Sequence, residues 1–312
     1  MKKFVVFYLL CTITNIAFAQ SAKHELGLVT ENDAYLSEYQ DKYYTNGIFL
    51  FYRYLANNHQ QNVNKKIIEF TAGQQIYNPY HGDIYPENLQ DRPFAGYLFA
   101  QASINKFYQD EAVLKISGQL GVLGPGSYGE QVQDAYHGWF HFYQPNGWEL
   151  QIKNAMGVQA ELFYSKKLYP SAPSEQIDIS GFTDLKIGTI HTSASVGFLS
   201  RISITDLLPI FNSNIYGASV GSDNTKNTEA YFYIEPQVNY TLYDATIQGS
   251  MFDKSSPLVF GVVPFRLNVE TGIRLRFKKV NISYSVIFNS KEVQNNIVKR
   301  DQYGSIAFSV LL

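Results

Sequence analysis

Segments of about ten residues, in which apolar and polar side chains alternate, recur from residue 24 to the end of the chain. Between residues 114 and 122, for example, Leu114, Ile116, Leu120 and Val122 alternate with polar or small residues. A period of two predicts β-strands with one apolar face and one polar face. The sequence therefore predicts an all-β chain, because the same pattern recurs in 237–242, 273–278, 282–288 and 306–312.

Strands of this kind fit either a soluble sandwich or barrel, or a transmembrane barrel whose apolar face contacts lipid. The segments are near the length that crosses a bilayer at a tilt, whereas sandwich strands usually have about five or six residues. Arg274, Arg276 and Lys278 lie opposite the apolar face, where a small soluble barrel would bury them. Lipid contact is favoured, and aromatics near the strand ends predict interfacial girdles at Tyr35, Tyr43, Tyr44, Tyr231, Tyr233 and Tyr243.

We predict an all-β fold, a transmembrane antiparallel β-barrel of about twelve strands. Segments rich in Gly, Pro, Asn and Ser, at 78–90 and 212–227, are predicted to be long loops. The predicted strands lie near 24–33, 44–57, 67–77, 96–108, 111–123, 148–168, 176–189, 190–203, 229–243, 257–270, 271–280 with 281–290, and 302–312.

Residues 1–19 have the layout of a cleaved signal peptide, because Lys2 and Lys3 precede an apolar run that ends near Ala17-Phe18-Ala19. We therefore expect an exported chain whose barrel domain is 20–312. The only cysteine, Cys11, falls within the signal, which excludes a disulfide framework. The formal net charge of −2 and the scattered Lys and Arg residues argue against a nucleic-acid partner.

One segment departs from the strand pattern and has the period of a helix. Gly124-Pro125-Gly126 ends a strand, and Ser127 and Glu130 have the spacing of a capping box. The helix that follows is amphipathic, and Gln133 and His137 are neighbours on its polar side. Its apolar face would carry Val132, Ala135, Tyr136, Trp139 and Phe140, and its polar face Gln133, Asp134, His137 and His141.

Several motifs in this order resemble the outer-membrane lipid A 3'-O-deacylase family. Each string is weak alone, but their joint order and spacing make an accidental similarity improbable. They cover about half of the chain that follows the signal, as a general barrel pattern replaces them beyond residue 154. The motifs are Glu31-Asn32-Asp33, Asp41-Lys42-Tyr43-Tyr44-Thr45-Asn46-Gly47, Asp91-Arg92-Pro93-Phe94-Ala95-Gly96, Gly124-Pro125 through Gln133 and His137, and Gly147-Trp148-Glu149-Leu150-Gln151.

The resemblance implies a twelve-stranded bacterial outer-membrane barrel with its active site between the barrel wall and a short helix on the extracellular side. The substrate would be lipid A, from which the 3'-linked acyloxyacyl chain is removed by ester hydrolysis with a divalent cation, usually Ca²⁺. By this carry-over, His137 is the general base, and Asp33 and Asn32 hold the cation. Thr45 completes the polar cluster. We expect a monomer.

Elementary chemistry is compatible with these roles. A near-neutral imidazole accepts a proton from water, and a hard cation held by oxygen ligands stabilises an oxyanion. Asn32 and Asp33 are consecutive, so an unbroken strand would point them to opposite sides. We therefore predict that the strand ends or bulges there.

Other residues of the motifs have more than one interpretation. Arg92 is a candidate to bind a lipid A phosphate or to pair with Asp91, and Gln133 is a candidate substrate contact. Trp148 is interpreted as an interfacial anchor. The family has an acidic residue six positions after the histidine and a lysine in the loop before the Asp-Arg motif, whereas this chain has Tyr143 and no lysine in 77–90.

Two other functions stay open at this point. The departure at Tyr143 allows a catalytically silent barrel with a structural or transport role. The same base and cation would also serve a phospholipase acting on glycerophospholipids.

Overall fold

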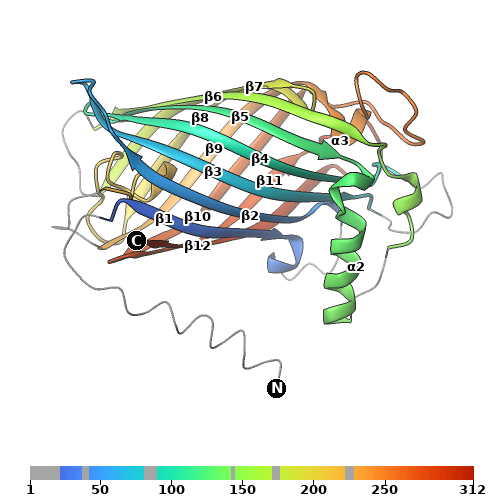
Figure 1. Ribbon diagram of the computed structural model, residues 1–312, viewed down its shortest axis with the longest axis horizontal. Coiled ribbons are helices and arrows are strands. Elements are labelled where there is room, and N and C mark those ends of the chain that lie inside the picture. Colours follow the sequence, from blue (N-terminus) through green and yellow to red (C-terminus); the bar gives the residue numbers. More distant parts are fainter. Residues whose placement is uncertain (1–21, 37–41, 81–89, 142–144, 171–175, 222–227) are drawn as a thin grey trace.

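The computed structural model describes residues 22–36, 42–80, 90–141, 145–170, 176–221 and 228–312. The predicted signal peptide and Tyr143 lie outside the described residues. Twelve antiparallel strands of the described chain form a closed barrel in which β1 pairs with β12 (Figure 1). The predicted all-β barrel is confirmed; its strands are β1 (His24–Asn32), β2 (Tyr43–Ala56), β3 (Val63–Asn78), β4 (Ala95–Tyr108), β5 (Ala112–Leu123), β6 (Ala155–Tyr169), β7 (Ile177–Gly188), β8 (His191–Ser203), β9 (Thr228–Asp244), β10 (Phe265–Phe277), β11 (Val280–Ser290) and β12 (Arg300–Leu311).

The alternation sorts side chains between the two faces of the wall. On β1, Leu26 and Leu28 are exposed on the outside, whereas Glu25 is buried in the lumen. Exposed Leu120 and Val238 show the same outward orientation on β5 and β9. An apolar outer face and a polar interior invert the pattern of a soluble protein and suit contact with lipid. No helix among the described residues is both long and apolar enough to cross a membrane.

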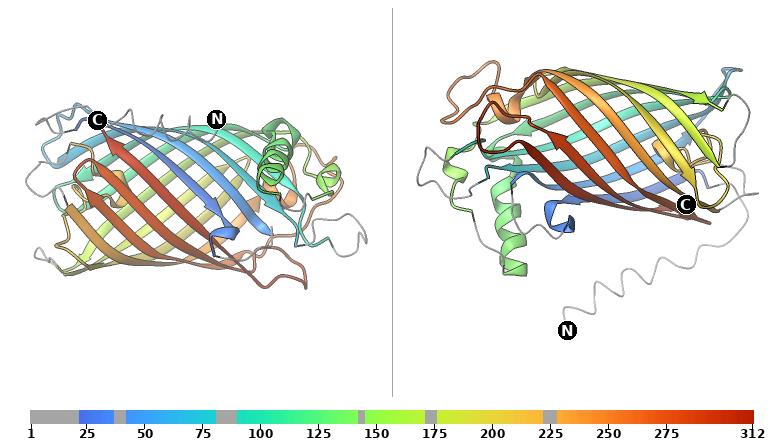
Figure 2. Two further views of the ribbon diagram at one scale, coloured as in Figure 1. Left: turned by 90° about the horizontal axis from the view of Figure 1, so that it is seen from below. Right: turned by 180° about the vertical axis from the view of Figure 1, so that it is seen from behind.

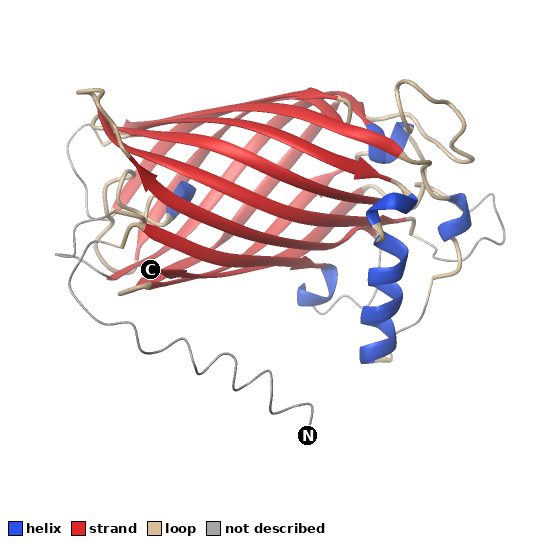
Figure 3. Cartoon of the chain, viewed as in Figure 1, coloured by secondary structure: helices blue, strands red, loops and turns tan. Residues whose placement is uncertain are grey.

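The short helices lie mostly at one end of the barrel, which we call the helix-bearing end (Figures 1 and 3). The other end holds the C-terminus and is called the C-terminal end (Figure 2). It also carries η5 (Ile215–Gly217). At the helix-bearing end lie η1 (Asp33–Leu36), η3 (Pro125–Ser127), α2 (Gly129–Phe140), η4 (Trp148–Leu150) and α3 (Ala245–Gln248).

Residues 204–221 fold into the barrel at the C-terminal end, and we call this segment the plug. Its apolar residues, which include Leu207, Ile210 and Ile215, form a buried cluster with strand residues such as Ile67 and Phe107. Polar contacts add to this packing, because the ammonium group of Lys65 on β3 donates to the carbonyl of Ala218 at 3.1 Å. The predicted loop at 212–227 is therefore, as far as residue 221, a packed part of the barrel interior.

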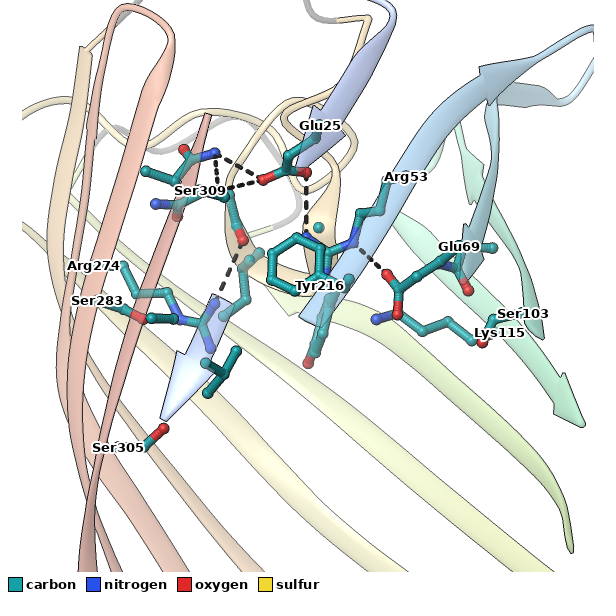
Figure 4. A pocket seen from close by; sticks show the side chains of 18 of the residues that line it. Glu25, Arg53, Glu69, Ser103, Lys115, Tyr216, Arg274, Ser283, Ser305 and Ser309 are labelled. Atoms are coloured by element: carbon teal, nitrogen blue, oxygen red, sulfur yellow. Dashed lines mark hydrogen bonds and ion pairs between the residues drawn. The ribbon is translucent and has the colours of Figure 1, made fainter. Parts of the chain in front are cut away.

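A polar cavity of about 440 Å³ lies in the lumen and borders the plug. Its wall carries charges of both signs, and Arg53 lies between Glu25, at 3.2 Å, and Glu69 (Figure 4). The plug contributes Tyr216 to the lining. Charges such as Arg276 thus occupy the interior, as the alternation predicted.

Three predicted strand ranges are corrected by the structure. The predictions at 257–270 and 271–280 merge into the single strand β10, and the apolar residues before it pack in a loop. Phe260 and Val262 belong there to a buried cluster with Ile247 of α3. The prediction at 148–168 began too early, because residues 148–150 form η4 and β6 starts at Ala155. An apolar run therefore need not be a strand where loops have a core of their own.

The predicted aromatic girdle is wrong for four of its six tyrosines. Tyr43, Tyr44, Tyr231 and Tyr233 are buried. Their buried hydroxyl groups have hydrogen-bond partners. Tyr231, for example, donates to Asn214 Oδ1 of the plug at 2.7 Å. A tyrosine near a strand end faces either side according to its position in the alternation, so composition alone does not place it.

Candidate active site

The predicted irregularity at Asn32 and Asp33 is confirmed. β1 ends at Asn32, and Asp33 begins η1. Asn32 Oδ1 accepts a hydrogen bond from the backbone N–H of Ala34 at 2.7 Å, which turns the chain out of the strand. Asp33 is buried, and its Oδ2 accepts from the backbone N–H of Lys42 at 3.2 Å. The two consecutive polar residues therefore no longer obey strand alternation.

A bulge in β2 changes the direction of Thr45. In the pairing with β3, Tyr44 lies opposite Tyr77 and Asn46 opposite Ile76, so Thr45 is the additional residue. Tyr44 faces the lumen, where its hydroxyl donates to Glu31. Without the bulge Thr45 would take that direction; instead its hydroxyl lies 3.5 Å from Asp33 Oδ2. The bulge thus brings the Thr45 hydroxyl to the Asp33 carboxylate.

The strand register continues this site across the outer face of the wall. Asn32 lies opposite Asn46, Asn46 opposite Ile76, and Ile76 opposite Gly96 on β4. These four residues share the outward face, and Ile76 is nevertheless buried because α2 covers it. We call this row of four residues the outer row.

Two glycines let α2 approach the outer row closely. A Cβ on Gly96 would lie 2.2 Å from Ser127 Oγ and 3.1 Å from the Cα of Gly129, the first residue of α2. A Cβ on Gly129 would in turn lie 3.0 Å from the Cα of Gly96. Gln74 on β3 also donates to the carbonyl of Ser127 at 2.6 Å. The base of α2 is therefore held directly against the backbone of β4.

The face that α2 buries is the polar one. Gln133 and His137 are each 2% exposed, whereas Trp139 is 86% exposed. An amphipathic helix on a protein surface normally buries its apolar side, so this orientation is reversed. On the apolar side, Ala135 and Trp139 are exposed, whereas Val132 is partly buried. His137 is buried away from solvent. The helix α2 that carries it lies at the same end of the barrel as η1 (Figure 1).

The predicted helix is confirmed, but its predicted capping box is wrong. The residue before the helix is Tyr128, in a left-handed conformation with φ 59°, and its side chain makes no capping hydrogen bond. Ser127 instead donates to the carbonyl of Gly124 at 2.6 Å and accepts from the N–H of Gly129 at 3.3 Å. The close contact with β4, rather than a capping box, therefore fixes the start of α2.

Gln133 is oriented by a tryptophan. Trp148 on η4 donates its indole N–H to Gln133 Oε1 at 2.9 Å. Trp148 is 2% exposed and packs with Ile76, Phe94 and Val132, so its interpretation as an interfacial anchor is wrong. With its oxygen bonded to the indole, Gln133 has its amide N–H groups available as donors to other partners.

Arg92 belongs to a different cluster. It is 0% exposed, pairs with Glu292 at 3.3 Å and donates to the hydroxyl of Thr246 at 2.8 Å. Its guanidinium lies 4.5 Å from the centre of the Tyr77 ring. Arg92 therefore connects loops of the helix-bearing end to the wall. Its neighbour Asp91 is also fully buried, and this burial raises the pKa of the Asp91 carboxyl group.

The oxygen atoms of the first cluster suit a hard cation. Asn32, Asp33 and Thr45 offer an amide, a carboxylate and a hydroxyl group, which Ca²⁺ accepts and Zn²⁺ disfavours. Among the described residues, no group of three or more His, Cys, Asp or Glu side chains could hold a metal ion. One carboxylate would thus need help from backbone, water or substrate oxygen atoms.

Sequence reasoning missed the residues that support the site. Gly96, Gly129 and Trp148 all stand in the motifs, yet their roles depend on contacts between strands, helix and loop. A glycine within a strand is a signal of close backbone approach, which could have singled out Gly96.

Comparison with known proteins gives the family. The family model described as outer membrane protein LpxR matches residues 5–312. The chain belongs to the LpxR family. The comparison with curated proteins finds no match.

One solved structure agrees with this LpxR-family assignment in fold. LpxR from Salmonella typhimurium aligns with a TM-score of 0.72 at 15% identity, over 92% of this chain and 100% of that chain. Two autotransporter barrels are less similar. The β domain of BrkA from Bordetella has a TM-score of 0.48 at 7% identity, over 94% of this chain and 100% of that chain. The translocator domain of NalP from Neisseria meningitidis has a TM-score of 0.43 at 8% identity, over 100% and 96%.

Proposed function

We propose that this LpxR-family barrel is an outer-membrane ester hydrolase that removes the 3'-linked acyloxyacyl chain of lipid A. The helix-bearing end would face the cell exterior, where lipid A lies. The reacting ester would sit between the outer row and the buried face of α2. The observation that carries the proposal is the reversed orientation of α2, which directs a histidine and a glutamine toward the wall of a lipid-embedded barrel.

In this proposal His137 is the general base. Its imidazole takes a proton from the water that attacks the ester carbonyl, a role typically worth about 10²–10⁴-fold in rate. Gln133, whose oxygen is bonded to Trp148, would donate an N–H to a substrate oxygen. Burial of both side chains excludes bulk water, which strengthens such polar interactions.

Asp33 and Asn32 would hold the divalent cation, with Thr45 completing the cluster. The bound ion would supply stabilisation of the negative charge that develops on the ester oxygen. The geometry supports this assignment, because the bulge in β2 brings the Thr45 hydroxyl to 3.5 Å from Asp33 Oδ2 at the end of β1. Ca²⁺ is the proposed ion on the basis of the hard oxygen donors.

Mass spectrometry of lipid A tests the function. Cells that express the chain should contain lipid A that lacks the 3'-linked acyloxyacyl chain, and His137→Ala should abolish this change. His141→Ala is the matched control, because His141 is exposed and one turn further along. Purified enzyme should lose activity with a chelator and regain it with Ca²⁺. Unchanged lipid A in cells that contain the folded chain would refute the proposal.

The two alternatives are separated by related measurements. A transport role is disfavoured by the plug, which packs into the barrel at the C-terminal end. Ion conductance of the wild-type chain in planar bilayers, without any change in lipid A, would favour that role. Release of fatty acid from phosphatidylethanolamine would indicate a phospholipase.

A further inference from the structure

Tyr43, the first residue of β2, has an unusual backbone. Its φ is 60°, in the left-handed region that a bulky side chain rarely adopts. It lies two residues before Thr45, at the start of the segment that carries the bulge. A strained residue persists where its surroundings hold it. The contacts of Tyr43 therefore indicate what holds the bulge.

These contacts come from the opposite end of the sequence. The side-chain amide of Asn295, in the loop between β11 and β12, donates to the hydroxyl of Tyr43 at 2.6 Å and to the carbonyl of Asp91 at 2.9 Å. Both hydrogen atoms of that amide are thereby used. The Tyr43 ring packs in the buried loop cluster with Val293 and Val298.

Asn295 is itself held in place by its own loop. Its Oδ1 accepts from the backbone N–H groups of Ile297, at 2.9 Å, and Val298, at 3.2 Å. The guanidinium of Arg92 lies 5.6 Å from the centre of the Tyr43 ring. The loops at 91–92 and 293–298 thus clamp one tyrosine, although they are far apart in the sequence.

The direction of Thr45 depends on this clamp. With Tyr43 fixed in the left-handed region, Tyr44 enters the lumen and bonds to Glu31. Thr45 then lies in the bulge, 3.5 Å from Asp33 Oδ2. If the start of β2 relaxed to regular strand conformation, alternation would turn Thr45 toward the lumen and away from Asp33.

We propose that Asn295 and Tyr43 are positioning residues for the active site, which set the placement of Thr45 against Asp33 through the hydrogen bond between them. The inference rests on the proposed function for its kinetic test. Neither residue touches substrate in this scheme. Their effect reaches the reaction through the Thr45 hydroxyl.

Two variants disrupt this hydrogen bond. Both also change a contact with Asp91, because the Tyr43 hydroxyl interacts with the Asp91 side chain and the Asn295 amide donates to the Asp91 carbonyl. Tyr43→Phe deletes the hydroxyl but keeps the ring, and Asn295→Asp deletes the amide donor but keeps the Oδ1 acceptor for Ile297 and Val298. Tyr97→Phe is the matched control, because Tyr97 is equally buried and donates to Gln119 Oε1 at 2.6 Å in the lumen. Each variant is assayed as folded protein in detergent micelles, with kcat and KM for deacylation of lipid A.

Tyr43→Phe and Asn295→Asp should each lower kcat about tenfold or more, with KM changed less than twofold, because small misplacements near reacting groups have large effects on rate. In a Thr45→Ala background neither variant should lower kcat further. Tyr97→Phe should leave kcat unchanged. A crystal structure of Tyr43→Phe should show the Thr45–Asp33 separation increased beyond 3.5 Å.

The outcomes separate this inference from the proposed function. Lack of deacylation by wild-type enzyme refutes the function, and the crystal structure of Tyr43→Phe then decides the inference alone. If wild type is active and His137→Ala inactive, wild-type kcat in Tyr43→Phe overturns the inference. The inference is also overturned if the losses of kcat add fully to the loss in Thr45→Ala, or if the Thr45–Asp33 separation in Tyr43→Phe is unchanged.

Discussion

Gly96→Ala should inactivate the enzyme by moving α2 away from the wall. The added Cβ would lie 2.2 Å from Ser127 Oγ and 3.1 Å from the Cα of Gly129. Ser127 cannot move aside freely, because it is fully buried and its hydroxyl donates to the carbonyl of Gly124. The base of α2 must therefore shift or Ser127 must lose its hydrogen bond.

The expected magnitude follows from the size of the overlap. An ordinary contact to a Cβ is about 3.5 Å or more, so relief of the Ser127 contact requires a displacement of about 1 Å. Misplacement of about 1 Å can lower a catalytic rate about 10²-fold, and overpacking costs typically about 1–3 kcal/mol of stability. We expect kcat to fall about 100-fold while the barrel remains folded, because the twelve strands do not depend on α2.

The assay is deacylation of lipid A by purified enzyme, followed by mass spectrometry, with thermal unfolding measured in parallel. Gly118→Ala is the matched control, since a Cβ on Gly118 meets no atom within 4 Å. Gly96→Ala with Ser127→Ala should recover part of the lost rate, because the closest contact is removed. Wild-type kcat in Gly96→Ala would refute the claim that close contact between β4 and α2 positions the site.

Two further predictions concern stability. Arg201→Ala should lower the unfolding temperature and increase ion conductance in planar bilayers, because Arg201 joins buried Asp178 and Glu229 and donates to the carbonyl of Leu208 in the plug at 3.0 Å; loss of such a partner costs about 3–5 kcal/mol. Lys166→Ala is the control, because the pair of Lys166 and Asp110 is exposed and its loss should cost at most about 1 kcal/mol of stability. Equal losses of stability in Arg201→Ala and Lys166→Ala would contradict the prediction. Asp91→Asn should unfold at a higher temperature than wild type at pH 8 but not at pH 3. Burial raises the pKa of Asp91 in the folded state, so the wild type loses stability as pH rises from the ordinary value, 3.8, through the raised one. Unfolding temperatures are measured by circular dichroism. If Asp91→Asn is stabilised as much at pH 3 as at pH 8, the charge of Asp91 is not the cause of the stabilisation.

Much of the fold could be predicted because strand alternation is a local property. The sorting of Leu26 and Leu28 outward, and of Glu25 inward, follows directly from period two. Loops were predicted less well, since residues 258–263 have a strand-like composition, yet Phe260 and Val262 pack against α3 and the loop near Val293. Contacts of that kind join distant parts of the sequence and leave no periodic signal.

The candidate site was predicted in its residues but only in part in its arrangement. The turn at Asn32 and Asp33 could be inferred, because two neighbours on one strand cannot serve one centre. The bulge at Thr45 could not, because it depends on pairing with β3. The tyrosines illustrate the same limit, since Tyr43 and Tyr44 are held by Asn295 and Glu31 rather than by a membrane interface.

The order of side chains along the chain was enough to specify a lipid-facing barrel, an amphipathic helix and the polar residues with catalytic potential, because each is encoded by spacing within one segment. Only the tertiary structure decided which face of α2 is buried. Gly96 and Gly129 bring the helix against the outer row, and the polar face with His137 is turned inward as a result. That choice depends on atoms from separate strands meeting in space, which spacing within a single segment does not record.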